Sequence, residues 1–279
     1  MKEILLYISI GPVQEFIASA RRCQDLWYGS YLLSQLSETC AYAIQEALSS
    51  ALANDDSNRF ALIFPADLSH QSSMESMVAN KILLKIPQTL SDQMKGIAKA
   101  GGDAVLARLK EEKDLAFRKI LSNEKARNFF NEQMAEAQLN ELIEYSWIAL
   151  PVDGSYQETR VDADSVLTAR KTSKEWEQIS WNTGLEVPKS SLDGARESVI
   201  YEEAFDRLSE TQRRQFFGIK KGERLCGVGL LKRLGAIAQE ERNSSGRYRP
   251  AFHSTSHLAA APLLTAIQSS NHADDCALA

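Results

Sequence analysis

The chain has 279 residues, of which 44% are hydrophobic and 25% are charged, values that are ordinary for a globular protein with a sizeable core. Its formal net charge of -5 excludes a global positive field, so any contact with RNA or DNA needs a local basic patch. No apolar stretch approaches a membrane span, no signal peptide is recognisable, and the four cysteines lack CxxC spacing, which together predict a cytoplasmic protein with free thiols.

The first part of the chain alternates short apolar runs with helical patterns. The apolar runs predict four strands, at residues 4–10, 60–64, 82–86 and 145–150. Helical spacing follows the first run, at about 13–20 and 26–52, and occupies 89 to about 144 before the last run. The resulting order is βαββαβ, which predicts the α+β class and a ferredoxin-like domain of the kind shared by polymerase and cyclase palms. That order hosts many functions.

The remaining residues predict a mostly helical region. Helices are expected at 162–180, at about 202–217 and within "KKGERLCGVGLLKRLGAIAQEER", with a turn-rich segment at 182–198. The segment "NSSGRYRPAFHSTSHLAAAP" reads as a loop before a short final helix. We therefore expect two regions, residues 1–154 and 155–279.

Gly11 and Pro12 join the first predicted strand to a helix. Glycine permits a tight exit, and proline suits the first helical position because its missing N–H is not needed there. A helix N-terminus presents free N–H groups and partial positive charge, which suit a phosphate. The alternative is a tight turn without a ligand, which is favoured on the residues alone because many such turns bind nothing.

Two further motifs each have a structural alternative. The Gly-Gly-Asp at residues 101–103 resembles the start of a GGDD cyclase motif, but Ala104 replaces the second aspartate and the flanks favour helix, so we expect a break between two helices. His253 and His257 are four residues apart and could share a metal on a helix. The serines and threonine between them favour a capping segment instead.

The densest basic run in the chain comprises Arg213, Arg214, Lys220, Lys221, Arg224, Lys232 and Arg233. It could hold an RNA backbone, and a solvated helix face is an equally good interpretation. No Ser-His-Asp, Cys-His or paired-carboxylate arrangement stands out, so no catalytic residue is assigned.

Several longer segments carry a resemblance to a known family. The stretch "ISIGPVQEFIASARRCQDLWYGSYLLS" resembles the start of the first palm domain in the large subunit of type III-B (Cmr) CRISPR effector complexes. "LTARKTSKEW", "SSLDGARESVI", "GERLCGVGLLKR" and "HSTSHLAAAP" are similar to later blocks of that family, in the same order. The resemblance thus spans nearly the whole chain and identifies it as an N-terminal half of the subunit.

The chain departs from the family pattern at three places. It starts at the first palm strand, without the HD nuclease domain that often precedes it. Of the paired cysteines of the family's zinc finger, Cys226 is kept, but Ser190 and Gly229 stand where cysteines are expected, so we expect a degenerate finger without zinc. The second palm with its GGDD motif and the C-terminal helical domain would follow this chain.

The resemblance also implies a nucleotide site. In the family ATP binds between the two palms, and the second palm makes cyclic oligoadenylates. One side of that cleft would be lined or supported by Gly11, Pro12, Gln14, Ser30 and Ser34, with Trp27, Tyr28 and Tyr31 as packing residues behind it. ATP with magnesium is expected only when a second palm is present.

These implications lead to a non-catalytic scaffold as the expected function. The expected partners are other Cmr subunits, especially the one holding the 5′ handle of the guide RNA, with guide and target RNA nearby and no membrane. The basic run at 213–233 would dock a subunit or contact RNA. One alternative is half of a split enzyme, completed by a separate GGDD palm polypeptide; another is a degenerate product without function.

Overall fold

The fold is described from a computed structural model that covers residues 2–52, 60–66, 68, 79–173, 187–243, 259–263 and 265–266. The chain forms two compact units, Met1–Ala238 and Gln239–Ala279, each taken by itself below. In the second unit the described residues are helical. The candidate ligands His253 and His257 lie outside the described residues, and the division expected after residue 154 stays a prediction.

A four-stranded antiparallel sheet forms the centre of the first unit. Its strands are β1 (Glu3–Gly11), β2 (Ala61–Phe64), β3 (Lys81–Pro87) and β4 (Glu144–Pro151), in the order β2-β3-β1-β4. All four predicted strands are confirmed, each within one residue at either end. The α+β class is confirmed as well. β1 is central and buried over all but its first residue, as its nearly continuous apolar run predicts.

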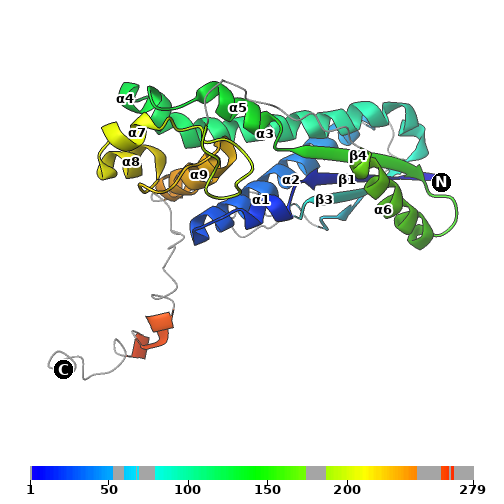
Figure 1. Cartoon of the computed structure of the whole chain (residues 1–279). Helices are drawn as coiled ribbons and strands as arrows, with labels where there is room; N and C mark the ends of the chain where they lie inside the picture. Colours follow the sequence, from blue (N-terminus) through cyan, green and yellow to red (C-terminus); the bar gives the residue numbers. More distant parts are fainter. Residues whose placement is uncertain are drawn as a thin grey trace. The chain divides into compact units, whose positions relative to one another are not determined.

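Side chains of β1 alternate between two layers of helices, because successive residues of a strand point to opposite faces. Ile4, Leu6, Ile8 and Ile10 belong to the larger core, which they share with α2 (Cys23–Ala51) and α3 (Met94–Leu121). Leu5 and Tyr7 belong to a smaller core on the other face, with residues of α6 (Tyr156–Thr172). Figure 1 shows α6 and the pair α2 and α3 on opposite sides of the sheet.

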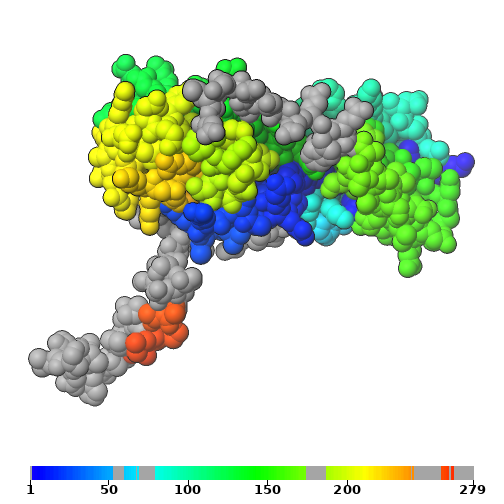
Figure 2. Space-filling model, viewed as in Figure 1, coloured from blue at the N-terminus to red at the C-terminus, as the bar shows by residue number. Residues whose placement is uncertain are grey.

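Helix α6 begins six residues before the predicted start at 162. Ser155 and Glu158 form a capping box there, a signal that the apolar pattern does not include. Tyr7 of β1 donates a hydrogen bond to Asp164 at 2.9 Å, and the Arg160 guanidinium lies 4.5 Å from the centre of the Tyr7 ring. Figure 2 shows α6, in green, at the surface of the molecule. Residues 174–180 of the predicted helix lie outside the described residues.

Four helices lie between β3 and β4: the 3-10 helix η1 (Gln88–Gln93), α3, α4 (Glu124–Arg127) and α5 (Glu132–Asn140). The predicted helix break at residues 101–103 is wrong, because α3 runs through it without interruption. A Cβ added to Gly101 would lie 2.8 Å from both Ile44 Cδ1 and the Tyr145 hydroxyl. These glycines therefore let α3 pack closely against α2 and β4.

The remaining described helices are α1 (Gln14–Ala18), α7 (Glu203–Arg207), α8 (Glu210–Phe217) and α9 (Gly227–Asn243). The single helix predicted at about 202–217 is thus two helices, since Ser209 and Gln212 form a capping box that starts α8. No helix within the described ranges is both long and apolar enough to cross a membrane.

Candidate functional site

The Gly-Pro junction lies at the end of β1. Gly11 pairs with Glu144 of β4, and a Cβ at Gly11 would lie 3.5 Å from a Glu144 carboxylate oxygen, an ordinary contact. The space around Gly11 therefore does not require a glycine. The expectation that Pro12 is the first helical residue is wrong, because Val13 is the N-cap and the exposed Gln14 begins α1. With five residues, α1 offers only a small dipole to a phosphate.

The two serines expected at the nucleotide cleft lie on α2, one turn apart. Ser30 is half-buried, whereas Ser34 is buried with 6% of its surface exposed. Ser34 therefore has little surface to offer a ligand. Neither serine, and none of Gly11, Pro12 and Gln14, lines the cavities described below.

The aromatic residues of the opening segment pack inside the fold. Trp27 and Tyr31 are stacked, with ring centres 5.1 Å apart. Tyr28 is fully buried and donates a hydrogen bond to Glu112 at 2.9 Å. A Cβ added to Gly235 of α9 would lie 2.1 Å from Tyr28 Cζ, so only a glycine allows α9 to approach this ring. Burial, together with Glu112, raises the pKa of Tyr28 well above its ordinary value.

Lys232 of α9 holds the end of α1. Its ammonium donates hydrogen bonds to the carbonyl of Phe16 at 2.7 Å, to the carbonyl of Ser19 and to the Ser19 hydroxyl at 3.1 Å. The ammonium also lies 5.0 Å from the centre of the Phe16 ring. These bonds satisfy carbonyls that a helix end leaves free. The Lys232 side chain is fully buried, and this burial lowers its pKa to about 8.

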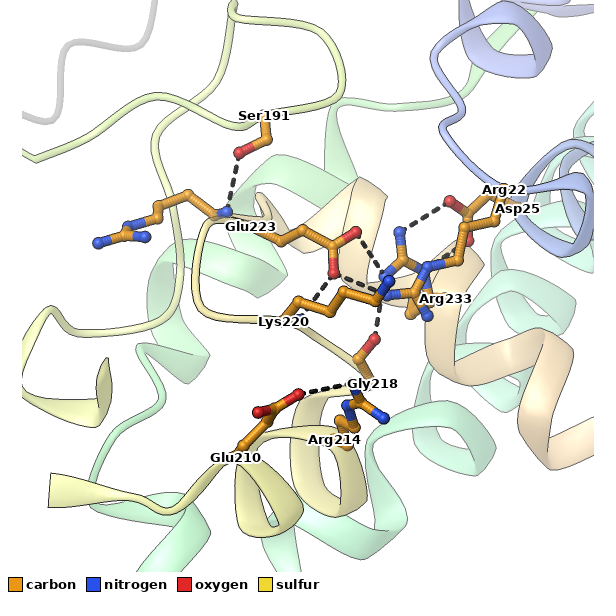
Figure 3. Close-up of polar contacts among 10 residues, drawn as sticks. Arg22, Asp25, Ser191, Glu210, Arg214, Gly218, Lys220, Glu223 and Arg233 are labelled. Atoms are coloured by element: carbon orange, nitrogen blue, oxygen red, sulfur yellow. Dashed lines mark hydrogen bonds and ion pairs between the residues drawn. The ribbon is translucent and has the colours of Figure 1, made fainter. Parts of the chain in front are cut away.

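Arg233, the next residue, holds the start of α2. Its Nε and Nη2 donate to the two carboxylate oxygens of Asp25 at 2.6 and 2.9 Å, and both side chains are completely buried. Arg233 also donates to the Gly218 carbonyl at 3.0 Å and to Glu223 at 3.2 Å (Figure 3). Asp25 lies in the first turn of α2, where the helix dipole favours a negative charge.

Glu223 extends the ion pair into a cluster of four charges. Its second oxygen accepts a hydrogen bond from Arg22 at 2.7 Å and one from the Lys220 backbone N–H at 2.8 Å. Burial opposes the charge of Glu223, but the Lys220 N–H and the charges of Arg233 and Arg22 outweigh it and lower its pKa. Burial likewise opposes the charge of Arg233, but Asp25 and Glu223 hold its pKa above the ordinary value. We call Arg22, Asp25, Glu223 and Arg233 the buried charge cluster.

The seven basic residues singled out in the sequence do not form one surface patch. Lys232 and Arg233 are fully buried, and the largely buried Arg213 donates to the carbonyls of Phe205 and Leu208. Four lie at or near the surface. Arg214 pairs with Glu210 and Arg224 with Glu202, whereas the side chains of Lys220 and Lys221 form no ion pair within the part of the chain that is described. Apolar residues on both sides of Lys232 and Arg233 are the sequence signal for their burial.

Ser190 and Cys226, expected in a degenerate zinc finger, do come together. The buried Cys226 sulfur lies 3.7 Å from Asp193 Oδ2 and accepts the Gly229 N–H at 3.3 Å, and the Ser190 side chain lies close by. Burial raises the pKa of the Cys226 thiol. No three His, Cys, Asp or Glu side chains gather to hold a metal among the described residues.

A cavity lies between α3, β4 and α6, and none of its lining residues was predicted from the sequence as a site. It has a volume of about 650 Å³, and its lining includes basic and aromatic side chains, among them Lys95, Trp147, Arg170 and Lys171, together with the carboxylates of Asp103 and Glu144. These residues are separated by up to 76 positions, and only the folded sheet brings them together. No local motif could have identified them.

The chain resembles a known protein family over about half of its length. The family model for the N-terminal region of the CRISPR-associated protein Cmr2 matches residues 5–143, which run from within β1 to the residue before β4. No curated protein matches the chain.

Proposed function

Because the chain belongs to the family of the CRISPR-associated protein Cmr2, the large subunit of type III-B effector complexes, and carries its N-terminal region, we propose that it is a non-catalytic scaffold of that complex. Membership in a multi-subunit Cmr complex follows from the family. The more specific parts of the proposal are a ferredoxin-like palm, a supporting wall for an ATP cleft, a docking surface for other subunits and a cytoplasmic location.

The arrangement of the sheet supports the palm assignment. The order β2-β3-β1-β4, with helices between β1 and β2 and again between β3 and β4, corresponds to the βαββαβ ferredoxin-like connection. In addition, α6 covers the second face of the sheet, which gives this palm helices on both sides.

The residues at the junction fit a supporting wall better than a phosphate cradle. The nearest charged group to Gly11 is the Glu144 carboxylate, which disfavours a phosphate unless a cation lies between them. Lys232, which lies at the end of α1, already donates to the carbonyls of Phe16 and Ser19. Of the residues expected at the cleft, Gln14 is exposed and Ser30 is half-exposed, so these two offer polar side chains to a ligand. Magnesium with ATP would supply the missing positive charge.

The buried charge cluster is the observation that carries the scaffold role. It fixes the beginning of α2 to α9, and Lys232 of α9 fixes the end of α1. Both helices that follow the Gly-Pro junction are therefore attached to α9. An element held in this way presents a fixed surface to a partner, which lowers the entropy lost on association.

The test is a pull-down of the tagged full chain from cells that express the other Cmr subunits and a guide RNA. We expect co-purification of the subunits with guide RNA, and weaker recovery for Lys220→Glu/Lys221→Glu, a pair exposed in the basic run. The matched control is Arg127→Glu/Arg207→Glu, which makes the same charge change at exposed positions elsewhere. Recovery of the chain without any Cmr subunit would refute the scaffold, and a co-purified GGDD polypeptide with cyclase activity would favour the split enzyme.

A further inference from the structure

A groove on the first unit combines free positive charge with a flat aromatic surface. It is the cavity of about 650 Å³ between α3, β4 and α6. These three elements lie beside one another in Figure 1, and α6 and α3 both contact β4. We call it the α3–β4 groove.

Four cations and two carboxylates, Asp103 and Glu144, line the α3–β4 groove, so positive charge is in excess there. Lys95 is exposed and makes no ion pair in the described part of the chain, nor do Arg170 and Lys171. Lys171 donates only to the Ser9 hydroxyl, at 3.2 Å. Lys99 alone is paired, with Asp103 one turn along α3. This differs from the buried charge cluster, where each cation has a carboxylate partner.

Trp147 supplies the flat surface of the groove. It lies on β4 and is half-buried, and the Arg170 guanidinium lies 5.5 Å from the centre of its ring. Aromatic rings and guanidinium planes are the surfaces on which unpaired bases stack in proteins that bind single-stranded RNA. A cation beside an aromatic plane suits a ligand that joins a phosphate to a base.

The groove continues along α3, which favours an extended ligand over a single nucleotide. A second hollow of about 390 Å³ shares Leu106 and Asn140 with the first. It adds Lys110, which is exposed, and Lys113, which pairs with Glu136 and Asp114. The two hollows are adjacent along α3, and lysines of α3 line both of them.

We propose that the α3–β4 groove binds single-stranded RNA, with Lys95, Arg170 and Lys171 at the phosphates and Trp147 beneath a base. The site is distinct from the basic run at 213–233, of which Arg213, Lys232 and Arg233 are buried. Binding would be electrostatic in its main part and tolerant of sequence, because the groove offers charge and a stacking surface rather than a pattern of hydrogen-bond partners for bases.

The test measures fluorescence anisotropy of a labelled poly(U) RNA with the purified full chain over a range of salt concentrations. We expect a Kd of about 1–100 µM at physiological salt. Lys95→Glu/Arg170→Glu should weaken binding at least tenfold and reduce the slope of log K against log salt by about 1.4, since each phosphate contact on a single strand contributes about 0.7. Trp147→Leu should weaken binding about fivefold or more, because it keeps an apolar side chain but removes the aromatic stacking surface.

The matched control is Arg127→Glu/Arg207→Glu, two exposed arginines that line neither hollow. Circular dichroism establishes that each variant is folded. The proposal is overturned if wild-type chain does not bind the RNA, if the control pair weakens binding as much as the groove pair, or if Trp147→Leu changes nothing. Displacement of the RNA by UMP at equal nucleotide concentration would overturn the extended site in favour of a mononucleotide pocket. Binding to Cmr subunits is measured separately, so either proposal can fail alone.

Discussion

The buried ion pair between Asp25 and Arg233 leads to a quantitative prediction for Asp25→Asn. The substitution keeps the shape of the side chain but removes the charge opposite a guanidinium that has no exposed surface. Removal of one partner of a buried pair typically costs about 3–5 kcal/mol. Glu223 remains 3.2 Å from Arg233, which places the expected loss near the lower value, about 3 kcal/mol. For a unit of this size that corresponds to a fall in Tm of about 6–12 °C.

The assay is urea unfolding of the full chain followed by near-ultraviolet circular dichroism, with Asp162→Asn as the control. Asp162 is exposed on α6 and makes no ion pair in the described ranges, so its substitution should change the free energy of unfolding by less than about 0.5 kcal/mol. A second substitution, Arg233→Met, removes the guanidinium charge that Asp25→Asn leaves without its partner. Asp25→Asn should therefore add less than about 1 kcal/mol to Arg233→Met, a strong departure from additivity. A loss below about 1 kcal/mol for Asp25→Asn alone, or additive losses, would refute the reasoning.

Three further predictions concern other buried groups. The pKa of Lys232 is about 8 in the folded chain and is higher in the unfolded chain, so the unfolded state binds more protons between these two values. The stability of the wild-type chain relative to Lys232→Met should therefore rise from pH 8 upward, by up to about 3 kcal/mol. Gly235→Ala would place a Cβ 2.1 Å from the Tyr28 ring and should destabilise the chain by about 1–3 kcal/mol or more in urea unfolding. Cys23 is exposed, whereas burial raises the pKa of Cys40 to about 12, so iodoacetamide should modify Cys23 and spare Cys40 in the native chain, as read by mass spectrometry.

Each of these has an internal comparison. For Lys232, a stability difference from Lys232→Met that is flat between pH 7 and 10 would contradict the lowered pKa. Gly222→Ala is the control for Gly235→Ala because nothing lies within 4 Å of a Cβ at that position. For the thiols, equal labelling of Cys23 and Cys40 before denaturation would show that the core opens more readily than its packing indicates.

The strands could be predicted from the sequence because their signal is local. β1 shows this most clearly: eight of its nine residues are buried, and its apolar run marks it without reference to other elements. The helix through residues 101–103 could not be predicted in the same way. Two adjacent glycines ordinarily disfavour helix, and the compensating contacts come from Ile44 and Tyr145, which lie on other elements.

The candidate sites were harder to predict because the local sequence does not show whether a charged side chain is exposed or is bound to a residue far away in the chain. Lys232 and Arg233 look like part of a basic surface until their acceptors are known, and these acceptors lie more than 200 residues earlier in the chain. The α3–β4 groove poses the opposite problem. Its residues are unremarkable in the sequence, and their alignment depends on three elements that meet only after the sheet has formed.

The separation between Asp25 and Arg233 has a consequence for the synthesis of the chain. The two residues are 208 positions apart, so at about 5–20 residues per second a ribosome adds Arg233 roughly 10–40 s after Asp25. During that interval the start of α2 carries an acidic side chain without its guanidinium partner, and the end of α1 has carbonyls without the Lys232 ammonium. The junction that opens the chain is therefore among the last parts to reach its final structure, although it is among the first to be translated.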